Sequence, residues 1–242
     1  MLDRYAEITL GAIQRVIEEE REGLRAGAAA VARSLDAGGV FHVFGSGHSE
    51  IVAREIVGRS GSLVPINQIV DRSEDLAEAV EGYGTLLADA YDQQYGLRPG
   101  ECALVVSNSG VNPLPVEIAR ACRERELTVI AITNVAQSRE AASRHSSGAR
   151  LFELADIVLD NHSPPGEAAV ALRDGGPRVG AIATITGAFL ANALVVETAR
   201  LLAEGGATVP VLTSENHDDP DALARNKHLR QRYGGRLRRF GA

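Results

Sequence analysis

Two loops rich in glycine and serine carry the side chains of this sequence that are best suited to bind an anion. The first reads FGSGHSE over residues 44–50, and the second reads SNSGVNPLPVE over residues 107–117. Each loop follows a short apolar run and precedes a segment with helical periodicity. Hydroxyl groups and the backbone N–H groups at the start of a helix donate hydrogen bonds to anions such as phosphate. The two loops therefore predict a site for an anionic ligand.

The second loop indicates which of its groups would meet the anion. Asn112 is a suitable N-cap, Pro113 suits the first helical position, and Pro115 also falls in the first turn. Because the two prolines lack N–H donors, the anion would depend on the hydroxyls of Ser107 and Ser109 and on the N–H groups that follow them. The alternative is an ordinary strand-to-helix turn that is capped by Asn112.

The first loop has a different alternative, which is the glycine fingerprint of dinucleotide-binding proteins. That fingerprint, G-x-G-x-x-G, needs glycine where this sequence has Glu50, whose carboxylate would lie near a pyrophosphate. Asp71 follows Gly45 by 26 residues, whereas the acid that binds the ribose is expected after about 20. The sequence also has no G-x-x-x-x-G-K-[ST] loop. These departures disfavour a nucleotide ligand.

Apolar runs and helical periodicity predict the elements that position the loops. The predicted strands are residues 40–44, 63–70, 102–106, 128–133 and 155–159. The predicted helices are residues 3–35, 48–60, 74–95, 112–126, 181–204 and 220–232. Buried strands that alternate with helices are typical of a parallel sheet covered on both faces. We expect an α/β fold, a three-layer αβα sandwich with a five-stranded parallel sheet, in which both loops leave the carboxyl edge, where ligands bind.

The composition predicts one globular domain. The chain has 242 residues, of which 45% are apolar and 24% are charged. Within the domain we expect an N-terminal helical arm over 1–36, a core over 37–205, and a C-terminal helix with a basic tail over 206–242. The net charge of −7 disfavours a nucleic-acid partner. The seven basic residues from Arg225 onward are expected to pair with the acidic surface of the chain itself, and the tail helix to reach a neighbouring subunit.

Cysteine usage and hydropathy predict a cytoplasmic protein. Cys102 and Cys122 are the two cysteines, and they lack the C-x-x-C spacing of a metal site. Residues 1–25 are charged throughout and contain no signal-peptide core. The weakly polar run at 181–196 is shorter than the roughly 20 apolar residues that span a bilayer. We expect no membrane partner and no metal.

The loops and the segments around them resemble the sugar isomerase (SIS) domain family. The resemblance is carried by FGSGHSEIVAREIVGRSGSL, LVVSNSGVNPLPVEIA, SRHSSGARLFELADIVLDN and SENHDDPDALARNKHLRQRY. It covers nearly the whole chain and is specific to a bacterial subgroup often labelled phosphoheptose isomerase or sugar isomerase domain protein. The resemblance implies a five-stranded parallel sheet whose two serine-rich loops hold a phosphosugar. It also implies a homodimer or homotetramer in which the subunits complete each other's sites.

The resemblance assigns roles to residues of both loops. Ser107, Ser109 and Asn112 match the phosphate-binding loop, and Asn108, which lies between them, is also expected to bind the substrate. Ser46 and Ser49 match the first loop, which faces the sugar or its phosphate. Glu55, in AREIVGR, matches the region of the catalytic glutamate of phosphoheptose isomerase. The catalytic histidine of that enzyme, in the long late helix, corresponds by position to Leu190 here, which is a departure from the family pattern.

Interconversion of an aldose and a ketose needs a base at the substrate carbons and an acid at the carbonyl oxygen, without a metal or cofactor. Glu55 is the expected base, and His48 or His217 the expected acid. Each has a structural alternative. Glu55 could form an ion pair with Arg54 or Arg59 on an exposed helix face. His48 could bond a neighbouring carbonyl group.

His217 has two alternatives of its own. It could belong to a helix N-cap before Pro220, or it could bind a metal with Asp218 and Asp219, although their spacing is not that of a known metal site. The function expected for the chain is a cofactor-independent phosphosugar isomerase. The alternatives are a phosphosugar sensor without catalysis and a phosphosugar lyase or etherase.

Overall fold

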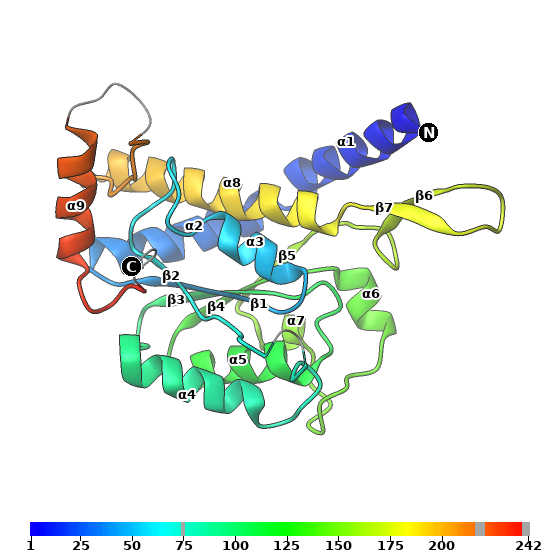
Figure 1. The fold of residues 1–242 in the computed structure, drawn as a ribbon, viewed down its shortest axis with the longest axis horizontal. Helices are drawn as coiled ribbons and strands as arrows, with labels where there is room; N and C mark the ends of the chain where they lie inside the picture. Colours follow the sequence, from blue (N-terminus) through cyan, green and yellow to red (C-terminus); the bar gives the residue numbers. More distant parts are fainter. Residues whose placement is uncertain (74–75, 216–220, 239–242) are drawn as a thin grey trace.

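A five-stranded parallel sheet forms the centre of the computed structural model, which describes residues 1–73, 76–215 and 221–238 (Figure 1). Its strands are β1 (Phe41–Gly45), β2 (Ile66–Gln68), β3 (Cys102–Val106), β4 (Thr128–Thr133) and β5 (Ile157–Asp160). They lie in the order β2-β1-β3-β4-β5. All neighbouring pairs are parallel, so the prediction of a five-stranded parallel sheet is confirmed.

Helices cover both faces of this sheet (Figure 1). On one face lie α2 (Arg21–Asp36), α3 (Ser49–Glu55) and α8 (Ala183–Glu204), and on the other lie α4 (Tyr83–Tyr95), α5 (Pro113–Glu124) and α7 (Leu151–Leu154). Leu104 and Val106 of β3 pack in the first layer, whereas Ala103 and Val105 pack in the second. Successive strand residues point to opposite faces, so one strand contributes to both cores. The predicted αβα sandwich is confirmed.

The remaining elements lie at the ends of the sandwich. They are α1 (Leu2–Glu19), α6 (Val135–Glu140), the antiparallel pair β6 (Ala168–Ala171) and β7 (Arg178–Ala181), and α9 (Ala222–Arg232). The β6–β7 hairpin and α1 extend from the same end of the molecule (Figure 1), and a small apolar cluster that contains Ile8 and Val170 joins them.

The prediction of a single helix over residues 3–35 was wrong, because the chain bends at Glu20 between α1 and α2. Glu20 has φ −96° and ψ 5°, and its carboxylate accepts a hydrogen bond of 2.9 Å from Nε2 of His162. Because His162 follows β5, this contact ties the bend to the sheet. The N-terminal helical arm therefore consists of two helices that meet at a bend held by this contact.

The prediction that the helix after the first loop runs to residue 60 was also wrong. Helix α3 ends at Glu55. Gly58 and Gly61, a few residues later, have φ of 64° and 81°, in the left-handed region that glycine adopts without strain. The chain turns at these glycines toward β2. Helix α3 is therefore short, and Glu55 lies at the end of it that is farther from the first loop.

Helix α8 is long and apolar enough, by length and composition alone, to cross a membrane. Its 22 residues contain a window with a mean hydropathy of 1.4. In the fold, however, Leu190, Ala191 and Leu194 are buried in the core shared with α2 and α3. This packing is that of a core helix in a sandwich layer.

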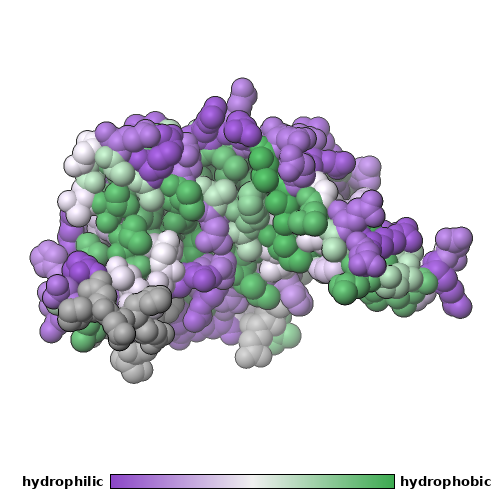
Figure 2. Space-filling model, turned by 90° about the horizontal axis from the view of Figure 1, so that it is seen from above, coloured by the Kyte–Doolittle hydropathy of each residue, from purple (hydrophilic) through white to green (hydrophobic). Residues whose placement is uncertain are grey.

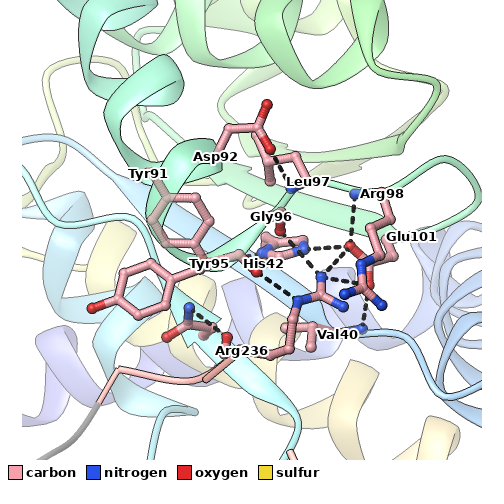
Figure 3. A network of polar contacts seen from close by, with 11 residues as sticks. Val40, His42, Tyr91, Asp92, Tyr95, Gly96, Leu97, Arg98, Glu101 and Arg236 are labelled. Carbon is pink, nitrogen blue, oxygen red and sulfur yellow. Dashed lines mark hydrogen bonds and ion pairs between the residues drawn. The ribbon is translucent and has the colours of Figure 1, made fainter. Parts of the chain in front are cut away.

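The basic tail reaches back to the start of β3, where Arg236 lies beside Glu101 (Figure 3). Nη2 of Arg236 donates to both carboxylate oxygens of Glu101, at 2.9 Å each. Glu101, which directly precedes β3, also accepts a hydrogen bond of 2.9 Å from Nε2 of His42. The expected pairing of the tail with its own chain is thus confirmed at Arg236. Asn67 also binds the tail, because its Nδ2 donates to the carbonyl of Arg236.

Burial and hydrogen bonding shift the pKa values of this network in defined directions. Burial alone would raise the pKa of Glu101. Hydrogen bonds from the His42 side chain, the backbone N–H of Arg98 and the Arg236 side chain outweigh this effect and lower the pKa to about 2. Burial lowers the pKa of His42 below 6.5, against the opposing effect of Glu101. His42 is therefore neutral, with Nε2 donating to Glu101 and Nδ1 accepting from the Tyr91 hydroxyl at 2.9 Å.

Candidate functional site

The carboxyl edge of the sheet carries an asparagine one or two residues after the end of each of three neighbouring strands. Asn108 comes two residues after β3, Asn134 directly after β4, and Asn161 directly after β5. All three are buried. Parallel strands bring these positions to one edge, as the sequence analysis expected for the loops. The asparagines of the three loops therefore form one connected layer.

Asn108 lies at the centre of this layer. Its Oδ1 accepts hydrogen bonds from Nδ2 of Asn161, at 2.8 Å, and from Oγ of Ser163, at 3.1 Å. Its Nδ2 donates to Oε1 of Glu167 at 3.0 Å. Because two donors occupy the oxygen, the amide has one orientation, with its N–H₂ group toward the carboxylate.

Backbone contacts hold Asn108 in place as well. Its carbonyl accepts from Oγ1 of Thr133 at 3.1 Å and from the N–H of Asn134 at 2.9 Å. Asn134 in turn donates to Oγ of Ser163 at 2.9 Å and caps α6 through the N–H of Gln137. A buried network in which each amide is satisfied is rigid. The polar groups of this edge are therefore held in fixed positions.

A small cavity of about 20 Å³ opens beside Asn108. It is lined by His48, Ser49, Val52, Val106, Asn108, Ile132, Asn161, Glu167, Ala183 and Thr184. These residues come from the first loop, helix α3, the ends of β3, β4 and β5, the segment before β6, and the start of α8. Because one water needs roughly 10–15 Å³, the cavity has room for no more than one or two waters in this conformation. A larger ligand must displace its rim.

The rim contains two of the three first-loop candidates. His48 is exposed and Ser49 is half-buried, and both line the cavity. Ser46, in contrast, is buried, and its hydroxyl donates to Oε1 of Glu78 at 2.9 Å. The structure thus brings His48 and Ser49 together with Asn108 and directs Ser46 toward the segment that precedes α4.

The second-loop candidates lie on both sides of Asn108. The hydroxyl of Ser107 accepts the N–H of Gly110 at 3.2 Å and so closes the turn of the loop. Ser109 is half-buried. Asn112 is the N-cap residue of α5, but its Oδ1 accepts a hydrogen bond of 3.1 Å from Arg144 instead of capping the helix. Of these candidates, Asn108 is among the described residues that line the cavity.

Glu55 forms an ion pair with Arg59, which matches the structural alternative considered from the sequence. Its side chain is 35% exposed, and it is not among the described residues that line the cavity. Helix α3 rises about 1.5 Å per residue, which separates Glu55 from Ser49 by roughly 9 Å along the axis. A catalytic role for Glu55 stays a prediction. His217 lies outside the described residues, and Leu190 is buried in the core.

Two residues of the site were not singled out from the sequence. Glu167 precedes β6 and Thr184 is in the first turn of α8, and both line the cavity. A signal for Glu167 was present, because it lies in the connection after β5, which must also leave the carboxyl edge of the sheet. Among the described residues, no three or more His, Cys, Asp and Glu side chains gather in a group that could hold a metal.

Comparison with known proteins places this architecture in a family. The sequence model of the SIS domain matches residues 4–134. A UPF0309 protein of Shouchella clausii is 33% identical over 242 residues, which cover 94% of this chain and 97% of that protein. A UPF0309 protein of Listeria monocytogenes serotype 4b is 31% identical over 246 residues, which cover 100% of this chain and 99% of that protein.

Three solved structures share the fold. A phosphoheptose isomerase of Neisseria gonorrhoeae matches 81% of this chain and 95% of its own, with a TM-score of 0.56 and 18% identity. A phosphoheptose isomerase of Francisella tularensis also matches 81% and 95%, with a TM-score of 0.57 and 16% identity. The Vibrio vulnificus NanR protein complexed with ManNAc-6P matches 84% of this chain and 63% of its own, with a TM-score of 0.52 and 20% identity. With the domain match and full-length relatives, these findings show that the chain belongs to the SIS domain family.

Proposed function

We propose that this protein binds a phosphorylated sugar at the carboxyl edge of its sheet. The observation that carries the proposal is the buried polar layer beside the cavity, in which Asn161 and Ser163 fix the amide of Asn108 and direct its N–H₂ group to the Glu167 carboxylate. The solved structure of NanR with ManNAc-6P, which shares the fold, supports a phosphosugar as the ligand.

The two loops would divide the ligand between them. Ser107, Ser109 and Asn112 match the phosphate-binding loop of the family, and the half-buried Ser109 directly follows Asn108. The sugar carbons would extend into the cavity between His48, Ser49 and the first turn of α8. Because the cavity is small in the described conformation, the first loop and the segment before β6 would separate when the ligand enters.

We propose that the bound sugar phosphate is isomerised between aldose and ketose without a metal or cofactor. The similarity in fold to phosphoheptose isomerase supports this reaction, and His48 on the cavity rim supplies a group that can transfer a proton. The second candidate is a sensor that binds the same ligand without catalysis. The Vibrio vulnificus NanR complex favours this alternative. A lyase that begins with the same proton abstraction is the third candidate function.

We propose that the protein is located in the cytoplasm.

We further propose that the protein is a homodimer or homotetramer. Figure 2 shows apolar residues gathered on the face seen from above, where α3 and α8 lie in Figure 1. The exposed large apolar residues of these two helices include Ile51 of α3 and Val196 of α8, at 54% and 67% exposure. Exposed apolar patches mark interaction sites in soluble proteins. A second copy of the chain would cover this face and would place Glu55, on the same helix as Ile51, near a subunit boundary.

Thermal shift with a panel of hexose, pentose, heptose and N-acetyl sugar phosphates tests the proposed ligand class. A ligand at about 100 times its dissociation constant stabilises the folded state by about 2.7 kcal/mol. At least one sugar phosphate is expected to raise the melting temperature, whereas the same sugars without phosphate are not. Equal shifts from both sets, or no shift at all, would refute binding through the phosphate.

A further inference from the structure

We infer that Glu167 is the catalytic base, the carboxylate that moves the proton between the sugar carbons in this cavity. The inference rests on the proposed phosphosugar isomerase function and adds a residue that the family resemblance did not assign. Three observations lead to it: the lining of the cavity, the contact of Glu167 with Asn108, and the backbone conformation of Glu167.

The first observation is the identity of the residues around the cavity. Among its described lining residues, Glu167 is the one with a carboxylate. The other acids near the two loops are engaged elsewhere. Glu50 accepts from Nε2 of Gln68 at 3.2 Å, and Glu78 accepts from Ser46. Glu117, which is buried, accepts the N–H of Thr85 at 3.2 Å.

The second observation is how the carboxylate is held. Oε1 of Glu167 accepts the hydrogen bond from Nδ2 of Asn108, and Asn108 cannot turn its amide without losing the bonds from Asn161 and Ser163. One carboxylate oxygen is therefore oriented by the rigid layer at the sheet edge. No side chain among the described residues binds the second oxygen, which is the one that would meet a substrate carbon. A base held by such a layer needs little reorganisation during proton transfer.

The third observation is the backbone of Glu167, which has φ of 68°. Glutamate in the left-handed region costs about 1–3 kcal/mol, and glycine would fit there without strain. The conformation is imposed from both sides, because the N–H of Glu167 donates to the carbonyl of Pro164 at 2.8 Å and its carbonyl accepts from Ile182 at 3.3 Å. Strain at a residue that lines a cavity is a feature of functional sites.

The reaction balances with Glu167 and His48 as the two protein groups. Glu167 takes the proton from C2 of the aldose, and the electrons of that C–H bond form the C1=C2 double bond. The electron pair of the C1=O bond moves to O1, which takes a proton from protonated His48. The resulting enediol then loses the O2 proton to His48 as C2=O forms, and Glu167 returns its proton to C1. Both groups regain their starting states.

The test is ¹H NMR of the full-length protein with sugar phosphates in D₂O, in which C2–H of the substrate exchanges for deuterium. Glu167→Gln keeps the shape and the hydrogen bond acceptor but cannot take the proton. Its exchange rate is expected to fall by about 10²–10⁴-fold, in the range of general-base contributions, while ³¹P line broadening by binding persists. Glu167→Asp, which retains a displaced carboxylate, is expected to restore part of the rate.

Glu126→Gln is the matched control, because Glu126 is also a glutamate in the left-handed region, with φ of 61°, and is exposed away from the cavity. Its exchange rate is expected to equal that of the unaltered protein. Glu55→Gln is the competing variant. Exchange that survives Glu167→Gln but is lost in Glu55→Gln overturns the inference and leaves the proposed function standing. Binding by the unaltered protein without any exchange overturns it too, in favour of a sensor. Absence of binding refutes the proposed function itself.

Discussion

Asn161 donates a hydrogen bond of 2.8 Å to Asn108 across the end of the strand that separates them. Asn108 follows β3 and Asn161 follows β5, and β4 lies between these strands. The bond therefore links the two outer loops of the site over the middle one. It leaves the amide of Asn108 a single orientation, on which both the proposed binding site and the position of Glu167 depend.

Replacement of this bridge is expected to weaken both stability and binding. Asn161→Ala removes the bond to Oδ1 of Asn108 and the acceptor for the N–H of Ser163, which lies 3.0 Å from Oδ1 of Asn161. Buried polar groups left without partners cost about 1–3 kcal/mol, so the free energy of unfolding in urea should fall by that amount. Affinity for the sugar phosphate should fall as well. Asn192→Ala, which removes an asparagine bonded to its own helix, is the control, and equal losses in the two variants would contradict the bridging role.

The Glu101 network predicts how stability depends on pH. The pKa of Glu101 is about 2 in the folded protein and ordinarily 4.5, so this carboxylate stabilises the fold fully above 4.5 and loses that contribution as the pH falls toward 2. The contribution is on the order of 3 kcal/mol. The lowered pKa of His42 acts in the same direction, since the unfolded state binds a proton below about 6.5.

The measurement is the free energy of unfolding between pH 7 and pH 3, for the unaltered protein and for Glu101→Gln. The variant should be less stable at pH 7, because Arg236 and His42 lose their charged partner, and its stability should decline less on acidification. Glu124→Gln, a change of an exposed carboxylate on α5, should leave the pH profile unchanged. Parallel profiles for all three proteins would show that Glu101 does not carry the dependence.

Relief of the strain at Glu167 is expected to be offset by the loss of its contact with Asn108. Glu167→Gly places the residue that adopts a φ of 68° most readily at this position, which relieves about 1–3 kcal/mol, but it also removes the carboxylate acceptor of Nδ2 of Asn108, at a similar cost. Glu126→Gly, at an exposed position, should raise the melting temperature by about 2–4 °C with no effect on deuterium exchange. A gain in Glu167→Gly as large as that in Glu126→Gly would mean that the contact with Asn108 contributes nothing to the fold.

The apolar face over α3 and α8 yields a prediction about assembly. Val196→Glu places a charge at an exposed apolar position of α8, and the residue is 67% exposed in the single chain, so folding should be unaffected. Light scattering after gel filtration should give at least twice the mass of 25.6 kDa for the unaltered protein and the monomer mass for the variant. A monomer in both cases would refute the proposed homodimer.

Removal of the chain from Arg225 onward separately tests whether the tail helix reaches a neighbouring subunit. An unchanged mass of the assembly would contradict that expectation.

Much of the framework could be predicted from the sequence because its core strands are strongly marked. The bounds of β3 and β4 were predicted without error, since CALVV and TVIAIT are buried apolar runs that end at polar loops. The carboxyl-edge rule also placed His48, Ser49 and Asn108 in one region. These predictions need local patterns and the direction of strands, and nothing more.

The remaining features depend on tertiary contacts that no local pattern shows. The hairpin strands AAVA and RVGA are short and built largely of small residues, so they lack the alternation that marks a strand. Glu167 precedes this hairpin and enters the site through its contact with Asn108, 59 residues away. Ser46 is of a residue type that binds phosphate, but in the structure its hydroxyl donates a hydrogen bond to Glu78 instead.

Binding of a phosphosugar by the two loops can be measured by ³¹P NMR of the sugar phosphate panel with the unaltered protein and with Ser109→Ala. At least one sugar phosphate is expected to show a broadened and shifted ³¹P resonance with the unaltered protein. Ser109→Ala, which removes a hydroxyl of the second loop, is expected to weaken this effect. Resonances that stay sharp for every sugar phosphate, or identical binding by the Ser109→Ala variant, would contradict phosphosugar binding by these loops.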